Sequence, residues 1–139
     1  MARTTFSGPV VSLNGFITDH TPGAANAINA TATATAAQVA TGYITSTSAA
    51  ATTITLPTGT LLGAALGATK GTVLDLFVDN TAGADVVTIA VATNGILSSA
   101  AADTAGSFGD LTIAAGATGL ACFRIMFSSA TAYVFTRIA

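Results

Sequence analysis

The sequence contains no tryptophan and no glutamate, and it is poor in charge of either sign. Its 139 residues include four Lys or Arg and six acidic residues, for a formal net charge of −2. A surface that binds nucleic acid needs a cluster of basic side chains along the phosphates. Because Arg3, Lys70, Arg124 and Arg137 are scattered singly, we do not expect nucleic acid among the partners.

Cysteine is almost absent, and no long apolar run occurs. Cys122 stands alone, which excludes an intrachain disulfide and a cysteine-based metal cluster, and its apolar surroundings predict a small buried side chain. The mean hydropathy is +0.70, yet no stretch approaches the ~18 unbroken apolar residues of a membrane-spanning helix. The N-terminus also lacks the apolar core of a secretory signal. We expect synthesis in the cytoplasm and no membrane partner.

Residue patterns typical of catalysis are missing. Asp75 and Asp79 share one face of an expected strand, but four residues of strand separate them by about 13 Å, too far for a glycosidase pair. His20 follows Asp19 in a turn-rich segment, and the sequence has no GxSxG motif and no glycine-rich phosphate loop. We therefore predict that the protein is not an enzyme, with no catalytic residues and no cofactor.

A metal site is the remaining possibility among the polar residues. Asp79, Asn80 and Asp85 flank a glycine-containing turn and carry oxygens of the kind that bind calcium. They do not have the spacing of an EF-hand, so we interpret them as ordinary turn residues and predict no metal.

Alanine and threonine dominate what is present, with 31 and 25 residues respectively. The length predicts one domain that buries roughly 68% of its unfolded surface. Small side chains bury little apolar area each, and a buried CH₂ contributes only about 0.8 kcal/mol. We therefore expect further apolar surface to be buried between subunits, as a homo-oligomer.

Residues 1–29 are predicted to form an extended N-terminal arm, and residues 30–139 a single β domain. Turn formers such as Gly8-Pro9, Asn14-Gly15 and Pro22-Gly23 break this arm into short pieces. Large apolar residues lie between them, including Phe6, Val10 and Phe16. The arm either docks these side chains on a partner or packs against its own domain.

The stretch from residue 52 to residue 80 predicts a strand, a short helix and a second strand. Thr52, Ile54 and Leu56 alternate with threonines until Pro57 ends the strand. A helix is expected from Thr60, with Leu61, Leu62, Ala65 and Leu66 on one face, a cap at Thr58 or Thr60, and Gly71 at its end. In the next strand Leu74, Leu76 and Val78 point one way, and Val73, Asp75, Phe77 and Asp79 point the other.

Strand signals continue on both sides of this stretch. Residues 30–50 alternate small and hydroxyl-bearing side chains, as in the threonine arrays of ice-binding proteins. No fixed repeat follows, so we predict a modest strand at 43–47. Residues 85–92, with Val87, Ile89 and Val91 on one face, are expected to form a hairpin with the strand before them.

Three further strands are expected at 110–114, 120–127 and 132–138. Ala121, Phe123, Ile125 and Phe127 form one core face and Val134 and Ile138 another. The predicted fold class is all-β: a jelly-roll or β-sandwich or barrel-like body with one short helix and the extended arm.

Three segments carry a resemblance to known proteins. The opening Thr5-Phe6-Ser7-Gly8-Pro9-Val10, followed by Asn14-Gly15-Phe16, resembles the start of small structural proteins of tailed bacteriophages. The blocks 54–90 (ITLPTGTLLGAALGATKGTVLDLFVDNTAGADVVTIA) and 114–138 (AAGATGLACFRIMFSSATAYVFTRI) are similar to phage head decoration, or capsid cement, proteins. The matching features are, in order, a strand ending in Leu-Pro, a small-residue helix, a hairpin closing on Asn-Thr-Ala (residues 80–82) and a final pair of strands.

The resemblance implies a structural virion protein on the outer surface of an icosahedral capsid, made in the host cytoplasm. Such proteins bind as homotrimers between subunits of the major capsid protein and stabilise the shell. By this analogy Phe6, Ser7, Gly8, Pro9, Val10 and Phe16 of the arm contact the capsid. The alternative is a phage surface or fibre module that binds host carbohydrate, for which the sequence offers Tyr43 and Tyr133 but no tryptophan.

Overall fold

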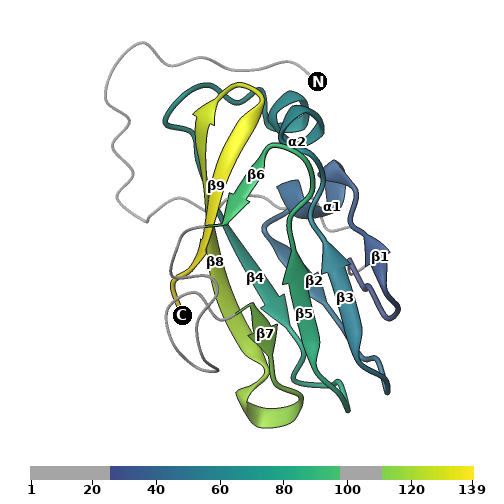
Figure 1. Cartoon of the computed structure of the whole chain (residues 1–139). Helices are drawn as coiled ribbons and strands as arrows, with labels where there is room; N and C mark the ends of the chain where they lie inside the picture. Colours follow the sequence, from purple (N-terminus) through teal and green to yellow (C-terminus); the bar gives the residue numbers. More distant parts are fainter. Residues whose placement is uncertain (1–25, 98–110) are drawn as a thin grey trace, which may run out of the picture.

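The computed structural model describes residues 26–97 and 111–139, and it is rich in strands (Figure 1). The four-stranded sheet contains, in spatial order, β1 (Ala32–Thr33), β3 (Thr52–Thr55), β5 (Val87–Ala90) and β7 (Thr112–Ile113). The five-stranded sheet contains β2 (Tyr43–Thr45), β4 (Val73–Asp79), β8 (Leu120–Ser129), β9 (Ala132–Arg137) and β6 (Gly95–Leu97). Neither sheet is closed. The additional elements are α1 (Ala36–Ala40), α2 (Gly59–Leu66) and the 3₁₀ turn η2 (Gly116–Thr118).

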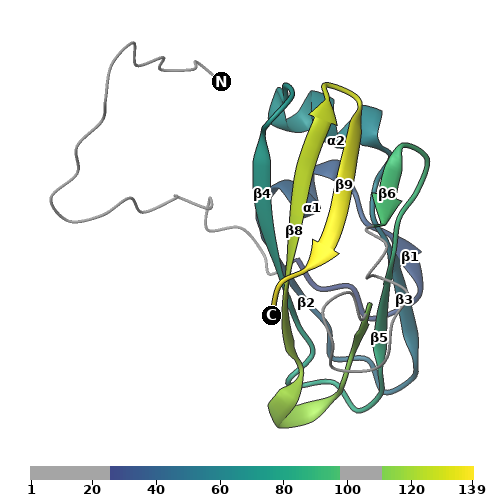
Figure 2. The ribbon, with the colours of Figure 1, turned by 60° about the vertical axis from the view of Figure 1, so that its left-hand side comes forward.

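From β1 to β8 the chain changes sheet after every strand. Among the first five strands, those that are two apart in the sequence lie side by side and run in the same direction, so β1–β3, β3–β5 and β2–β4 are parallel pairs. β5 and β7, in contrast, are antiparallel. The expected hairpin between β4 and β5 is wrong, because these strands lie in different sheets. β4 instead pairs antiparallel with β8, and β8 with β9. Figure 2 shows β4, β8 and β9 in one layer and β1, β3 and β5 in another.

One hydrophobic core joins the buried sides of both sheets. Phe123 and Phe135 stack in it with ring centroids 4.9 Å apart, and the Phe127 and Tyr133 rings meet at 5.8 Å. The predicted core face of β8 is confirmed, but the prediction for β9 is wrong. Tyr133 and Phe135 are fully buried, whereas Val134 and Ile138 are only half-buried. Both sets alternate along the strand, and a register shift between Phe127 and Ser129 turns the aromatic set inward.

The prediction of a single helix is also wrong, because α1 lies in the segment where only a strand was expected. Thr35 begins it: its hydroxyl accepts a hydrogen bond from the backbone N–H of Gln38, and the Gln38 side chain accepts one from the Thr35 N–H. This capping box satisfies donors that are otherwise unpaired at a helix start. Val39 fixes the helix to the core, where it is fully buried.

Helix α2 begins and ends earlier than expected. Thr58 caps its start, and Gly67, in the left-handed conformation, ends it in place of Gly71. Leu62 is buried and Leu66 packs on the core, but Leu61 and Ala65 face outward, contrary to the expected apolar face. Gly63 lies so close to the β8–β9 turn that a Cβ there would collide with the carbonyl oxygen of Ala130. Backbone contact at a glycine thus sets the helix position, and Leu61 is turned away.

Candidate functional site

The outer side of the five-stranded sheet, away from the core, is the most unusual surface of the molecule. We call it the apolar face and define it by six exposed side chains: Tyr43 on β2, Val73 and Phe77 on β4, Leu120 and Met126 on β8, and Ile96 on β6. Within residues 26–97 and 111–139, the exposed large hydrophobic side chains all lie here except Leu61. Single exposed apolar residues need no explanation, but a contiguous set of them marks an interaction surface.

The apolar face follows from strands that are hydrophobic on both sides. In β4, Leu76 and Val78 are buried in the core while Val73 and Phe77 are 53% and 44% exposed. In β8, Phe123 and Ile125 point inward while Leu120 and Met126 point outward. A strand with one wet side normally alternates apolar and polar residues, so this pattern is typical of a sheet covered on both faces.

Strand register arranges the apolar face in rows across the sheet. Tyr43 lies opposite Phe77, and Phe77 opposite Cys122. Two positions further along β4, Asp75 lies opposite Arg124, and Arg124 opposite Thr136. The next row crosses four strands: Val73 lies opposite Met126, Met126 opposite Val134, and Val134 opposite Ile96. A single polar row therefore separates two apolar rows.

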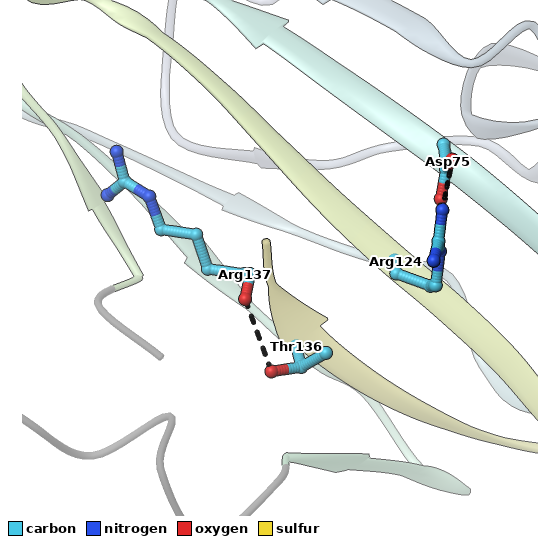
Figure 3. A network of polar contacts seen from close by, with 4 residues as sticks. All are labelled: Asp75, Arg124, Thr136 and Arg137. Atoms are coloured by element: carbon cyan, nitrogen blue, oxygen red, sulfur yellow. Dashed lines mark hydrogen bonds and ion pairs between the residues drawn. The ribbon is translucent and has the colours of Figure 1, made fainter. Parts of the chain in front are cut away.

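The polar row contains one ion pair with bidentate geometry (Figure 3). The Nε and Nη2 atoms of Arg124 each donate to a different carboxylate oxygen of Asp75 at 2.7 Å. These bonds hold the pKa of Asp75 below its ordinary value and raise that of Arg124. The two charges thus neutralise one another within the sheet face. The Asp75 side chain is therefore paired, and it is 37% exposed.

A second polar contact closes one end of the apolar face. The Tyr43 hydroxyl donates to Asp79 Oδ2 at 2.6 Å, and the backbone N–H and the hydroxyl of Thr81 both donate to Asp79 Oδ1. Hydrogen bonds from Thr81 and Tyr43 lower the pKa of Asp79, and the same bond raises that of Tyr43. Asp79 therefore fixes the Tyr43 ring at the edge of the face.

Asp79, Asn80 and Asp85, the three residues considered as calcium ligands, form hydrogen bonds with other groups of the chain. Asn80 is fully buried, and its Nδ2 donates to the carbonyl oxygens of Asp85, Ile113 and Ala114 at 2.9, 3.3 and 3.0 Å. Its side-chain oxygen, which has no hydrogen-bond partner, is packed against Gly83. Asp85 accepts from the N–H of Val86. Across the described part of the chain, His, Cys, Asp and Glu form no group of three that would hold a metal ion.

Asn80 instead joins the two crossovers at one end of the molecule. Its carbonyl oxygen accepts from Gly83 and Gly116, and its N–H donates to Gly119 at 2.6 Å. The β4–β5 and β7–β8 connections thus meet at one side chain. At the opposite end, the Tyr133 hydroxyl donates to Pro57 O at 3.0 Å, and burial raises the pKa of Tyr133 to about 12.

The predicted burial of Cys122 is confirmed. The residue lies on the outer side of β8 but is covered to 7% exposure, and burial raises the pKa of its thiol. It is therefore a small hydrophobic side chain rather than a reactive one.

The predicted capsid-contact residues Phe6, Ser7, Gly8, Pro9, Val10 and Phe16 lie outside the described residues, as do His20 and the loop 98–110. The sequence interpretation did not single out the apolar face. Its signal was nonetheless present in Val73 and Phe77, which alternate with core residues in an expected strand.

Comparison of the chain with protein-family models, with curated proteins and with solved structures finds no match. In the ranges that the structure describes, neither helix has the length and apolar character needed to cross a bilayer. The geometry of the surface is therefore the basis for any functional proposal, together with the resemblance in the sequence.

Proposed function

We propose that this chain is a structural virion protein that decorates and stabilises the outside of an icosahedral phage capsid, binding as homotrimers between subunits of the major capsid protein. The observation that carries the proposal is the apolar face, which presents apolar side chains suited to a protein partner. The charges of Asp75 and Arg124 on this face neutralise each other. The likeness of residues 54–90 and 114–138 to cement proteins supports the same function.

The architecture that goes with this proposal is a β-sandwich, with the two open sheets face to face across the shared core. The parallel pairs β1–β3, β3–β5 and β2–β4 favour a sandwich over a jelly roll, whose strands are antiparallel. A rigid two-layer body of this kind suits a protein whose role is mechanical. Its stiffness comes from pairing over many residues, with β4 joined to β8 from Val73 to Asp79.

The test of the capsid role uses the arm within the full-length chain. Phage particles without the protein are incubated with the wild type, with Phe6→Ala/Phe16→Ala, and with the arm control Thr18→Ala. We expect the double variant to lose at least ~90% of particle occupancy and the control to bind as the wild type, since buried aromatic anchors dominate interface energies. Unchanged occupancy by the double variant would remove the arm from the mechanism, and no binding by the wild type would overturn the proposal.

A second candidate is a phage surface module that binds host carbohydrate. One observation favours it: the rings of Tyr43 and Phe77 are 42% and 44% exposed and lie opposite one another on β2 and β4. Sugars stack on exposed aromatic rings of this kind. Tyr133, the other tyrosine, is fully buried and is not available to a sugar. Binding to a glycan array that Tyr43→Ala abolishes would favour this candidate over the capsid role.

A further inference from the structure

The apolar face is large enough to form a specific protein contact. Four adjacent strands of this sheet, β2, β4, β8 and β9, span roughly 20 Å across and about 20–30 Å along the strands, because strands lie about 4.8 Å apart and rise about 3.3 Å per residue. The resulting area of roughly 400–600 Å² is in the range of the largest functional patches on monomers. It is about half to three-quarters of the ~800 Å² that one partner buries in a standard interface.

The charges on this face constrain what covers it. Asp75 and Arg124 satisfy each other through two bonds of 2.7 Å, so a partner can cover the polar row without leaving a charge unpaired. The face therefore calls for an occupant that is itself nearly neutral and apolar. A strongly acidic partner would find no unpaired cation among the residues of this face, and a strongly basic one would find only the Asp79 carboxylate at its edge.

A second copy of the same face meets these requirements. It offers the same order of rows, apolar, polar and apolar, so that a copy turned to face the first places apolar rows against apolar rows. In this arrangement Asp75 of each copy lies opposite Arg124 of the other copy, so each cation faces a carboxylate. Like charges are then kept apart, and the two ion pairs form one neutral cluster.

We propose that the apolar face is the surface through which copies of this chain bind one another. The contact pairs two copies face to face, so it goes beyond the proposed function, and no capsid is needed for it. Phe77 lies between Tyr43 of β2 and Cys122 of β8, and we expect its burial to contribute most, because it is the largest wholly apolar side chain of the face.

The test is the mass of the purified full-length chain in solution, by light scattering over a range of concentrations. Phe77→Asp places a charge in the apolar row that contains Tyr43, and Val73→Asp places one in the other apolar row. The matched control is Leu61→Asp, because Leu61 is 60% exposed on α2 at the end of the molecule. Circular dichroism and urea unfolding establish that each variant is folded.

We expect the wild type and Leu61→Asp to be oligomeric, and both face variants to raise the dissociation constant by at least ~100-fold while remaining folded. A mass of three chains overturns this contact, because a surface that pairs with the same surface of one other copy joins the chains in twos. A mass of two chains supports this contact and overturns the trimer. A wild type that is monomeric at all concentrations, or folded face variants that stay oligomeric, overturn the contact. If the monomer instead binds particles and Phe77→Asp does not, the occupant is the capsid protein.

Discussion

The two sheets present opposite chemistry on their outer sides. The outer side of the four-stranded sheet carries a row of hydroxyls, Thr53 opposite Thr88 and Thr88 opposite Thr112, with Thr33 opposite Thr55 beside it. We call this the threonine face. The corresponding side of the five-stranded sheet is the apolar face. Both faces are made of residues that favour strands, because threonine is β-branched like valine.

This difference shows that strand propensity and solvent exposure are separate requirements. On the threonine face each strand alternates a core residue with a hydroxyl, so Ile54 and Ile89 are buried while Thr53 and Thr88 remain in contact with water. On the apolar face the second side of the strand is hydrophobic as well. The threonine face is suited to water, and the apolar face to a partner.

The largest effect is expected where the two sheets are joined. Asn80→Asp replaces the Nδ2 donor with an oxygen facing the carbonyls of Asp85, Ile113 and Ala114 in a buried site. We expect a loss of about 3–5 kcal/mol in the free energy of unfolding at pH 7, measured in urea. Asn29→Asp is the control, since Asn29 only accepts from the Thr47 N–H and an Asp keeps that bond. Equal stability of the two variants would contradict this account of Asn80.

The next effect is a conversion of the threonine face into a second apolar face. Thr53→Val/Thr88→Val replaces the hydroxyls of a directly opposed pair with methyl groups and keeps the β-branched shape. We expect the variant to form larger species than the wild type in light scattering at millimolar concentration, with the free energy of unfolding within about 1 kcal/mol. Thr53→Ser/Thr88→Ser is the control and should behave as the wild type. An unchanged mass for the valine pair would show that apolar character alone does not create a contact here.

A smaller, pH-dependent effect is expected from the ion pair of the apolar face. The pKa of Asp75 is lower in the folded than in the unfolded chain, so its contribution is present above the unfolded pKa and is lost as the pH falls through the folded value. Asp75→Asn should therefore lower the urea midpoint at pH 6 and leave it closer to the wild type near pH 3. Arg124→Gln, which removes the other partner of the pair, should show the same dependence on pH. A constant offset for Asp75→Asn at both pH values would contradict the role of the ionised pair.

The smallest effect is expected at the edge of the apolar face. Tyr43→Phe removes the hydroxyl that donates to Asp79 while keeping the ring. We expect the pKa of Asp79, followed by NMR, to rise toward its ordinary value, because one of the bonds that lower it is lost. The free energy of unfolding should change by less than about 0.5 kcal/mol. Thr81→Val, which removes the other hydroxyl donor, should raise the same pKa further, since Thr81 is the larger cause.

Much of the secondary structure was predictable because its causes are local. β3 and β4 alternate apolar residues with period two, Pro57 follows the end of β3, and Asn94-Gly95 forms a turn in which Asn94 has a positive φ of 63°. Helix α1 was predictable in principle from Thr35 and Gln38, whose capping-box spacing is visible in the sequence. It was not predicted because a segment of five residues, three of them alanine, shows no clear helical periodicity.

The pairing of strands was not predictable in the same way. The sequence places β4 and β5 close together with a turn between them, which favours a hairpin, yet Asn80 turns the chain into the other sheet. The choice between Val134 and Tyr133 as core residues likewise depended on the register between β8 and β9. These outcomes rest on contacts between distant residues, and local patterns carry no information about which of two alternating sets turns inward.

Local chemistry in the chain alone therefore decided where strands and helix caps lie and that charge is scarce, because each depends on neighbours within a few residues or on composition. Tertiary structure alone decided that Tyr43, Val73, Phe77, Leu120, Met126 and Ile96 share one surface. They come from four strands whose order in the sheet is set by the alternation of the chain between two layers. The physical reason is that packing of the core determines which side of each strand is buried, and the outer face consists of the sides that remain.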